Sequence, residues 1–171
     1  MSPPDEAVDL SMLEFFCAEL TEAAASVQAG LTALLDGPAP AAEAPAALVR
    51  AAGSIKAAAR IAGLSETADL ARAMEEVFET ARGTGRLPGR NADEALLAAT
   101  AVFVRLSRRE PQDIPQAVLA EADGMADLTA VLSQAAREPS ATTPPGRAGT
   151  AMPPAATPKP VAAHPPPVNQ A

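Results

Sequence analysis

The 171-residue chain carries a net charge of −8 and contains neither Trp nor Tyr, a single histidine and a single cysteine. One histidine and one cysteine cannot supply an intrachain disulfide, a Cys/His zinc site, or a triad or metal centre that needs two histidines. The isoelectric point near 4.6 is the reverse of the basic surface that nucleic acid requires. We therefore expect no cofactor, no metal and no nucleic-acid partner.

The ends of the chain differ in composition from its middle. The first ten residues hold three acids and two prolines, unlike the basic and apolar regions of a secretory signal. Residues 139–171 contain ten prolines and no acid, and cannot bury enough apolar area to become ordered. We expect disordered segments at 1–8 and 139–171, the latter a Pro-rich tail or linker, around a helical domain at 9–138. His164 lies in this tail and is expected to be inert.

The apolar residues are mostly alanines, 43 in all, which favour helices and let them approach closely. The longest apolar stretch, 96–104, is too short for a membrane span of about 20 residues. We expect a cytoplasmic monomer without membrane contact. Cys17, beside Phe15 and Phe16, is expected to be a small core residue in a reducing compartment.

The first helix is predicted to begin at Asp9 or Ser11, where Ser11 and Glu14 have capping-box spacing, and to end at Asp36 before Gly37. Residues 38–45 are predicted to form a loop. The predicted apolar stripe of this helix consists of Met12, Phe16, Leu20, Val27, Leu31 and Leu34.

The second helix is predicted at roughly 45–62, with Gly63 as its C-terminal cap. A third helix follows at once, with Ser65 as N-cap, and ends in the glycine-rich segment 83–89. The predicted buried residues are Leu48, Ala52, Ile55, Ala59 and Ala62 on the second helix, and Leu64, Ala68, Ala71, Met74, Phe78 and Ala81 on the third.

A fourth helix is predicted after the cap Asn91, and a fifth from Asp113 or Pro115 to Arg137. Their inward residues are Leu96, Ala99, Phe103 and Leu106, and Val118, Ala122, Met125 and Leu132. Short connections favour antiparallel neighbours. The predicted fold is all-α: an antiparallel up-and-down four-helix bundle with an additional C-terminal helix.

Residues 50–64 read Arg-Ala-Ala-Gly-Ser-Ile-Lys-Ala-Ala-Ala-Arg-Ile-Ala-Gly-Leu. This stretch resembles the signature helix of histidine-phosphotransfer (HPt) domains, whose pattern is Arg-x-x-His-x-x-Lys-Gly with a downstream Gly-Leu. It is most similar to the N-terminal domain of chemotaxis-type histidine kinases, including surface-sensing hybrid kinases. The resemblance covers about residues 9–107 and implies a phosphorelay role with receiver or kinase domains as partners.

The chain departs from the family pattern at its centre. Gly53 stands where the family has the phospho-accepting histidine, and Ala57 stands where it has glycine. Lys56 and Glu75 match, while Arg72 replaces a usual histidine. In the family the glutamate hydrogen-bonds the acceptor histidine. The resemblance thus implies that Arg72 and Glu75 are relics of an acceptor environment, with no catalytic residue present.

Helical geometry places Gly53 about 160° around its helix from Ile55, which we expect to be buried. The residues expected to share the outward face are Val49, Gly53, Lys56, Ala57 and Arg60. In the family this face docks onto a receiver and the lysine can neutralise phosphoryl charge. We therefore predict a docking face that keeps its cations but has no nucleophile.

Other candidate chemistry is weaker. Glu75 and Glu76 are adjacent on a helix, so they point about 100° apart and do not converge as an acid/base pair. Arg72 can pair with either one at helical spacing. The segment 83–86 lacks the spacing and the Lys-Ser/Thr of a P-loop. We predict no enzyme activity and no kinase domain.

Three hypotheses follow. The leading one is a non-phosphorylatable HPt-like signalling module that binds receiver or kinase domains, and such a chain can also be a truncated N-terminal segment of a chemotaxis-type kinase. The second is an active phosphotransfer protein with a displaced acceptor, for which His164 is the only histidine. The third is a structural helical interaction domain without a phosphorelay role.

Overall fold

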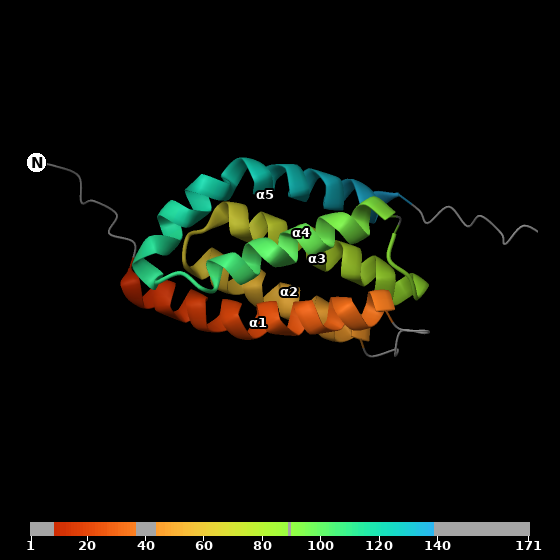
Figure 1. Ribbon diagram of the computed structural model, residues 1–171, viewed down its shortest axis with the longest axis horizontal. Helices are drawn as coiled ribbons and strands as arrows, with labels where there is room; N and C mark the ends of the chain where they lie inside the picture. Colours follow the sequence, from red (N-terminus) through yellow and green to blue (C-terminus); the bar gives the residue numbers. More distant parts are fainter. Residues whose placement is uncertain (1–8, 37–43, 89, 139–171) are drawn as a thin grey trace, which may run out of the picture. The chain divides into compact units, whose positions relative to one another are not determined.

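The computed structural model describes residues 9–36, 44–88 and 90–138, which contain helices and no strand (Figure 1). The predicted all-α class is confirmed. The predicted disordered segments at 1–8 and 139–171, with His164, lie outside the described residues. The elements are α1 Leu10–Asp36, α2 Ala44–Ile61, α3 Ser65–Thr84, α4 Arg90–Leu106, the 3-10 helix η1 Pro111–Asp113 and α5 Ile114–Arg137.

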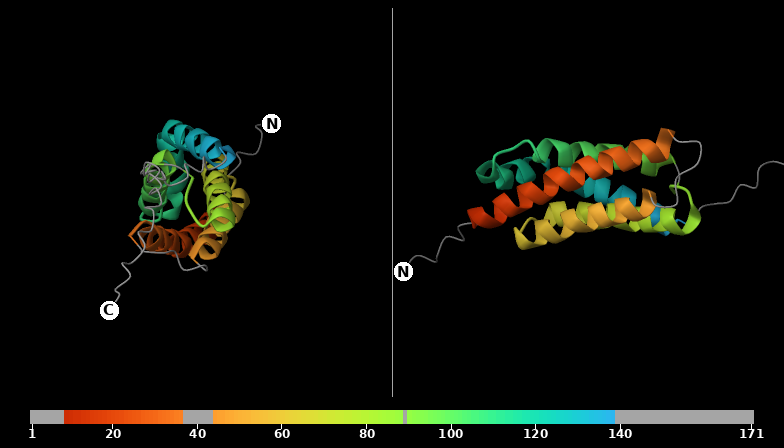
Figure 2. Two further views of the ribbon diagram at one scale, coloured as in Figure 1. Left: turned by 90° about the vertical axis from the view of Figure 1, so that its right-hand side faces the viewer. Right: turned by 90° about the horizontal axis from the view of Figure 1, so that it is seen from below.

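The fifth helix completes a closed arrangement rather than lying outside a four-helix bundle. In an end-on view, the helices surround one core in the order α1, α2, α3, α5, α4 (Figure 2). Helix α5 packs against both α3 and α4, which have little direct contact with each other. Because the chain runs up and down, α3 and α5 are parallel neighbours (Figure 1). The sequence predicted an additional helix but not this position.

The core is built from a few large side chains among many alanines. Phe16, Phe78 and Phe103 are fully buried. The inward residues predicted for α2, α3 and α4 are all buried, which confirms those stripes. On α1 one residue of the predicted stripe is wrong, because Met12 is exposed and Leu13 is buried instead.

Two of the predicted helix caps, Ser65 and Asn91, are displaced by one or two residues, whereas Asp9 and Gly63 are confirmed. Asp9 caps α1, since its Oδ1 accepts hydrogen bonds from the Ser11 hydroxyl and from the Ser11 backbone N–H, the latter at 3.0 Å. The hydroxyl bond first, and then the backbone bond, lower the pKa of Asp9. The predicted cap residues Ser65 and Asn91 lie within α3 and α4. Gly63 is confirmed as the end of α2: its φ is 72°, and the next N–H donates to the Ala59 carbonyl at 2.8 Å.

Cys17 is half-buried and packs against the edge of the core. Burial, with a smaller effect of the negative charge of Glu110, raises the pKa of its thiol. The neutral thiol is therefore favoured over the reactive thiolate. No helix among the described residues is long and apolar enough to cross a membrane.

Candidate functional site

Gly53 lies in the middle of α2, beside α3. Its backbone does not adopt the left-handed conformation that favours glycine, so helix geometry alone does not require glycine here. A Cβ atom at this position would lie 3.2 Å from Glu75 Oε1 of α3. Any side chain at position 53 would therefore begin in contact with the Glu75 carboxylate.

Lys56 and Glu75 form an ion pair that joins α2 to α3. The Lys56 ammonium donates a hydrogen bond to Glu75 Oε2, and each side chain is only 23% exposed. One carboxylate oxygen thus binds the lysine while the other faces Gly53. The sequence pattern singled out both residues but did not predict that they pair with each other.

The remaining residues of the predicted docking face are unequally exposed. Ala57 and Arg60 are exposed, whereas Gly53 and Lys56 are half-buried beside α3. Val49 corrects the prediction of a uniformly outward face, because it is half-buried and packs against the core. The fully accessible residues of the face are therefore Ala57 and Arg60.

Arg72 does not bind Glu75. Its Nη1 donates to Glu76 Oε1 at 2.6 Å, and its Nε lies 3.7 Å from Asp69 Oδ1. Glu75 and Glu76 have different cationic partners, Lys56 and Arg72, which confirms that their carboxylates do not converge. Only Glu75, of the two predicted relics, touches the Gly53 position.

Helix α2 is basic in an acidic domain. Its charged residues are Arg50, Lys56 and Arg60, without an acid. Arg50 and Ser54 line a groove of about 400 Å³ between α2 and α1, opposite Glu19. The Gly53 face therefore has cations on both sides. Within the described ranges, no three His, Cys, Asp or Glu side chains are grouped so that they could hold a metal ion.

A protein-family model described as the Hpt domain matches residues 11–110. The matched segment contains nearly all of α1 and the whole of α2, α3 and α4, and it ends before α5. No curated protein and no solved structure matches the chain.

Proposed function

We propose that this chain, which belongs to the Hpt domain family of phosphorelay signalling modules, binds receiver or histidine-kinase domains. In this proposal it does not accept a phosphoryl group. Residue 53 is the position at which the family pattern has its acceptor, and glycine has no side chain that could attack phosphorus. We also propose that the protein acts in the cytoplasm. It acts as a monomer, since one copy presents the whole docking face.

The observation that carries this proposal is the arrangement of Gly53, Lys56 and Glu75. The Glu75 carboxylate of α3 lies against the point where a side chain at position 53 would begin. Lys56, on the same helix as Gly53, neutralises that carboxylate. These two groups fit the surroundings of an acceptor imidazole, one as hydrogen-bond acceptor and the other as a cation near a phosphoryl group. The acceptor imidazole itself is missing, because residue 53 is glycine.

Binding is supported by the charge of Arg60 and by the exposure of Arg60 and Ala57 on α2. Arg60 is exposed and has no ion-pair partner among the described residues. Ala57, three residues earlier on the same helix, is exposed as well. A phosphorylated aspartate on a receiver is an anionic centre, so cations on α2 complement it.

A titration of receiver and kinase domains encoded near this gene tests the proposal. Arg60→Glu should weaken binding by about fivefold or more, because it sets a negative charge against an anionic partner. The double variant Lys56→Glu, Arg60→Glu should weaken it further. Arg109→Glu, an equal reversal at an exposed site outside α2, is the matched control and should leave affinity unchanged.

Absence of binding to any such domain would sink the proposal. Binding that ignores the reversals on α2 would instead favour a structural helical interaction domain that uses another face. Circular dichroism of each variant separates a loss of affinity from a loss of fold. Arg60→Glu serves best here, because it breaks no ion pair within the described residues.

A further inference from the structure

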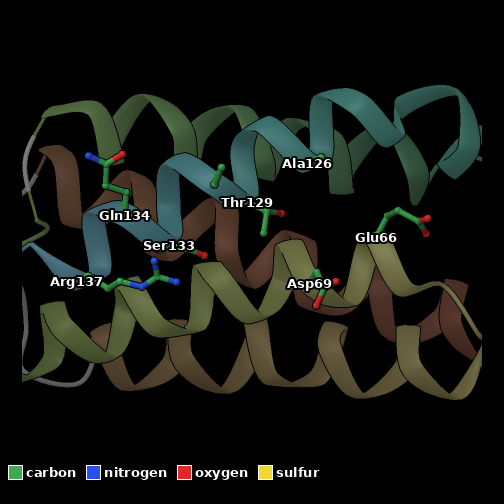
Figure 3. A pocket seen from close by; sticks show the side chains of 8 residues that line it. Glu66, Asp69, Ala126, Thr129, Ser133, Gln134 and Arg137 are labelled. Carbon is green, nitrogen blue, oxygen red and sulfur yellow. The ribbon is translucent and has the colours of Figure 1, made fainter.

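A second surface lies on the other side of α3, where a groove of about 640 Å³ separates it from α5 (Figure 3). Glu66 and Glu75 are nine residues apart on α3, so they point to opposite sides of the helix. Glu75 faces α2, whereas Glu66 lines this groove. One wall of the groove belongs to α5, which the Hpt match does not include.

Opposite charges lie at the two ends of the groove. Glu66 and Asp69 of α3 stand at one end, and Arg137 of α5 stands at the other (Figure 3). Asp69 is 61% exposed, and its only ion-pair contact within the described ranges is the long one to Arg72 at 3.7 Å. Arg137 is exposed and forms no ion pair with any residue that the structure describes. The charges of the groove are thus available to a ligand.

Ser133 supplies a buried polar group between these ends. Its residue is only 8% exposed, yet its hydroxyl has no hydrogen-bond partner among the described residues and lies between the two helices (Figure 3). Thr129, one turn earlier, donates its hydroxyl to the Met125 carbonyl at 2.7 Å. This hydroxyl lines the groove, so it can form a hydrogen bond with a ligand that enters there. Ser133 therefore offers a hydrogen-bonding group to an occupant that has backbone-like polar groups.

The length of the groove limits what can bridge its charges. The α5 wall runs from Ala126 to Arg137, about 16 Å along the helix axis. A single small ion cannot reach both ends, whereas an extended peptide of five residues spans about 16 Å. Residues 139–171 of this chain have two bases but no acidic side chain, so their side chains do not complement the charge of Arg137.

We propose that this groove binds an extended segment of a partner protein. The segment places a basic side chain against Glu66 and Asp69, an acidic side chain against Arg137, and backbone amides along Ser133. The two side chains are about four residues apart in the segment. This site does not depend on Gly53 or on the docking face of α2, and a failure here leaves the function proposed above untouched.

The test uses the full chain and a blocked pentapeptide with arginine at one end, glutamate at the other and three alanines between, in both orientations. In a nuclear magnetic resonance titration to about 10 mM, we expect saturable shifts centred on Ala126, Thr129 and Ser133. Asp69→Asn and Arg137→Gln should each weaken binding by about fivefold. Asp127→Asn and Arg109→Gln remove exposed charges outside the groove and should have no effect.

A second peptide, with glutamine in place of glutamate, assigns the contact. It should bind about fivefold more weakly than the first, and Arg137→Gln should then cause no further loss, because the acidic group it would bind is already absent. The proposal is overturned by the absence of saturable shifts in both orientations, by shifts centred elsewhere, or by binding that Arg137→Gln leaves unchanged. Unchanged melting temperatures of the variants keep these outcomes interpretable.

Discussion

Helix α3 lies between two surfaces that differ in how their charged side chains are paired. Towards α2, Glu75 is paired with Lys56 and lies against Gly53. Towards α5, among the residues that the structure describes, Asp69 has only a 3.7 Å contact with Arg72, and Arg137 and the Ser133 hydroxyl have no partner. The first surface belongs to the segment that the Hpt family shares, and the second needs a helix beyond that segment. The surface towards α2 thus has a close ion pair beside a glycine, while the surface towards α5 has charges without a close partner among the described residues.

Restoring an acceptor should change the α2 surface most. We expect Gly53→His with Ala57→Gly to gain acid-labile phosphoryl label from a phosphorylated receiver, where the unaltered chain gains none. The new Cβ would begin 3.2 Å from Glu75 Oε1, so a small movement of that carboxylate places it beside the imidazole. Autoradiography before and after acid treatment measures the gain.

The control for this restoration is Gly53→Ala with Ala57→Gly, which changes the same positions without adding an imidazole. It should remain unlabelled. If the histidine variant also stays unlabelled with its helical content intact, the surroundings of residue 53 do not support phosphoryl acceptance. The surface towards α2 would then not be a preserved acceptor site.

Removing a core side chain of α5 tests whether the added surface rests on a fixed wall. Met125 is fully buried, so Met125→Ala should lower the free energy of unfolding by about 2 to 5 kcal/mol. Leu119→Ala on the same helix removes a side chain that is 69% exposed and should change it by less than about 0.5 kcal/mol. Equal, small losses in urea denaturation would mean that α5 packs only loosely.

The ion pair of the α2 surface should be modest in energy. A double-mutant cycle with Lys56→Met and Glu75→Gln should give a coupling of about 0.5 to 1 kcal/mol, because both groups are partly exposed to solvent. The other ion pair between helices, Arg105 to Glu121 at 2.5 Å, has a more exposed cation and should couple more weakly. The reverse ranking would contradict the idea that Lys56 and Glu75 form a specially preserved pair.

The sequence predicted those features that depend on residues close together in the chain. The stripes of α2, α3 and α4 follow from helical periodicity, and Gly63 ends α2 because glycine tolerates a positive φ. The stripe of α1 was wrong at Met12 because Met12 and Leu13 are both apolar and adjacent. Either one fits a helical stripe when judged alone.

Features that depend on distant residues were not predicted. The place of α5 between α3 and α4 is decided by packing of whole helices, which no local pattern encodes. The pairing of Lys56 with Glu75 and the groove at Ser133 both depend on how neighbouring helices are aligned. A family pattern could point to the first pair of residues, but no pattern covered the second site because it uses α5.

The smallest expected effect bears on how closely Glu75 presses on residue 53. Replacing an interior helical glycine by alanine stabilises a helix by about 0.5 to 1 kcal/mol. Gly124→Ala in α5 should show this full gain, because a Cβ there meets nothing within 4 Å. Gly53→Ala should gain less, since its Cβ must displace the Glu75 carboxylate, which also holds Lys56. Equal gains in thermal unfolding would mean that Glu75 moves freely away from position 53. The Glu75 carboxylate would then not be fixed beside a side chain at position 53. The ion pair between Lys56 and Glu75 would be the one remaining difference between the two faces of α3.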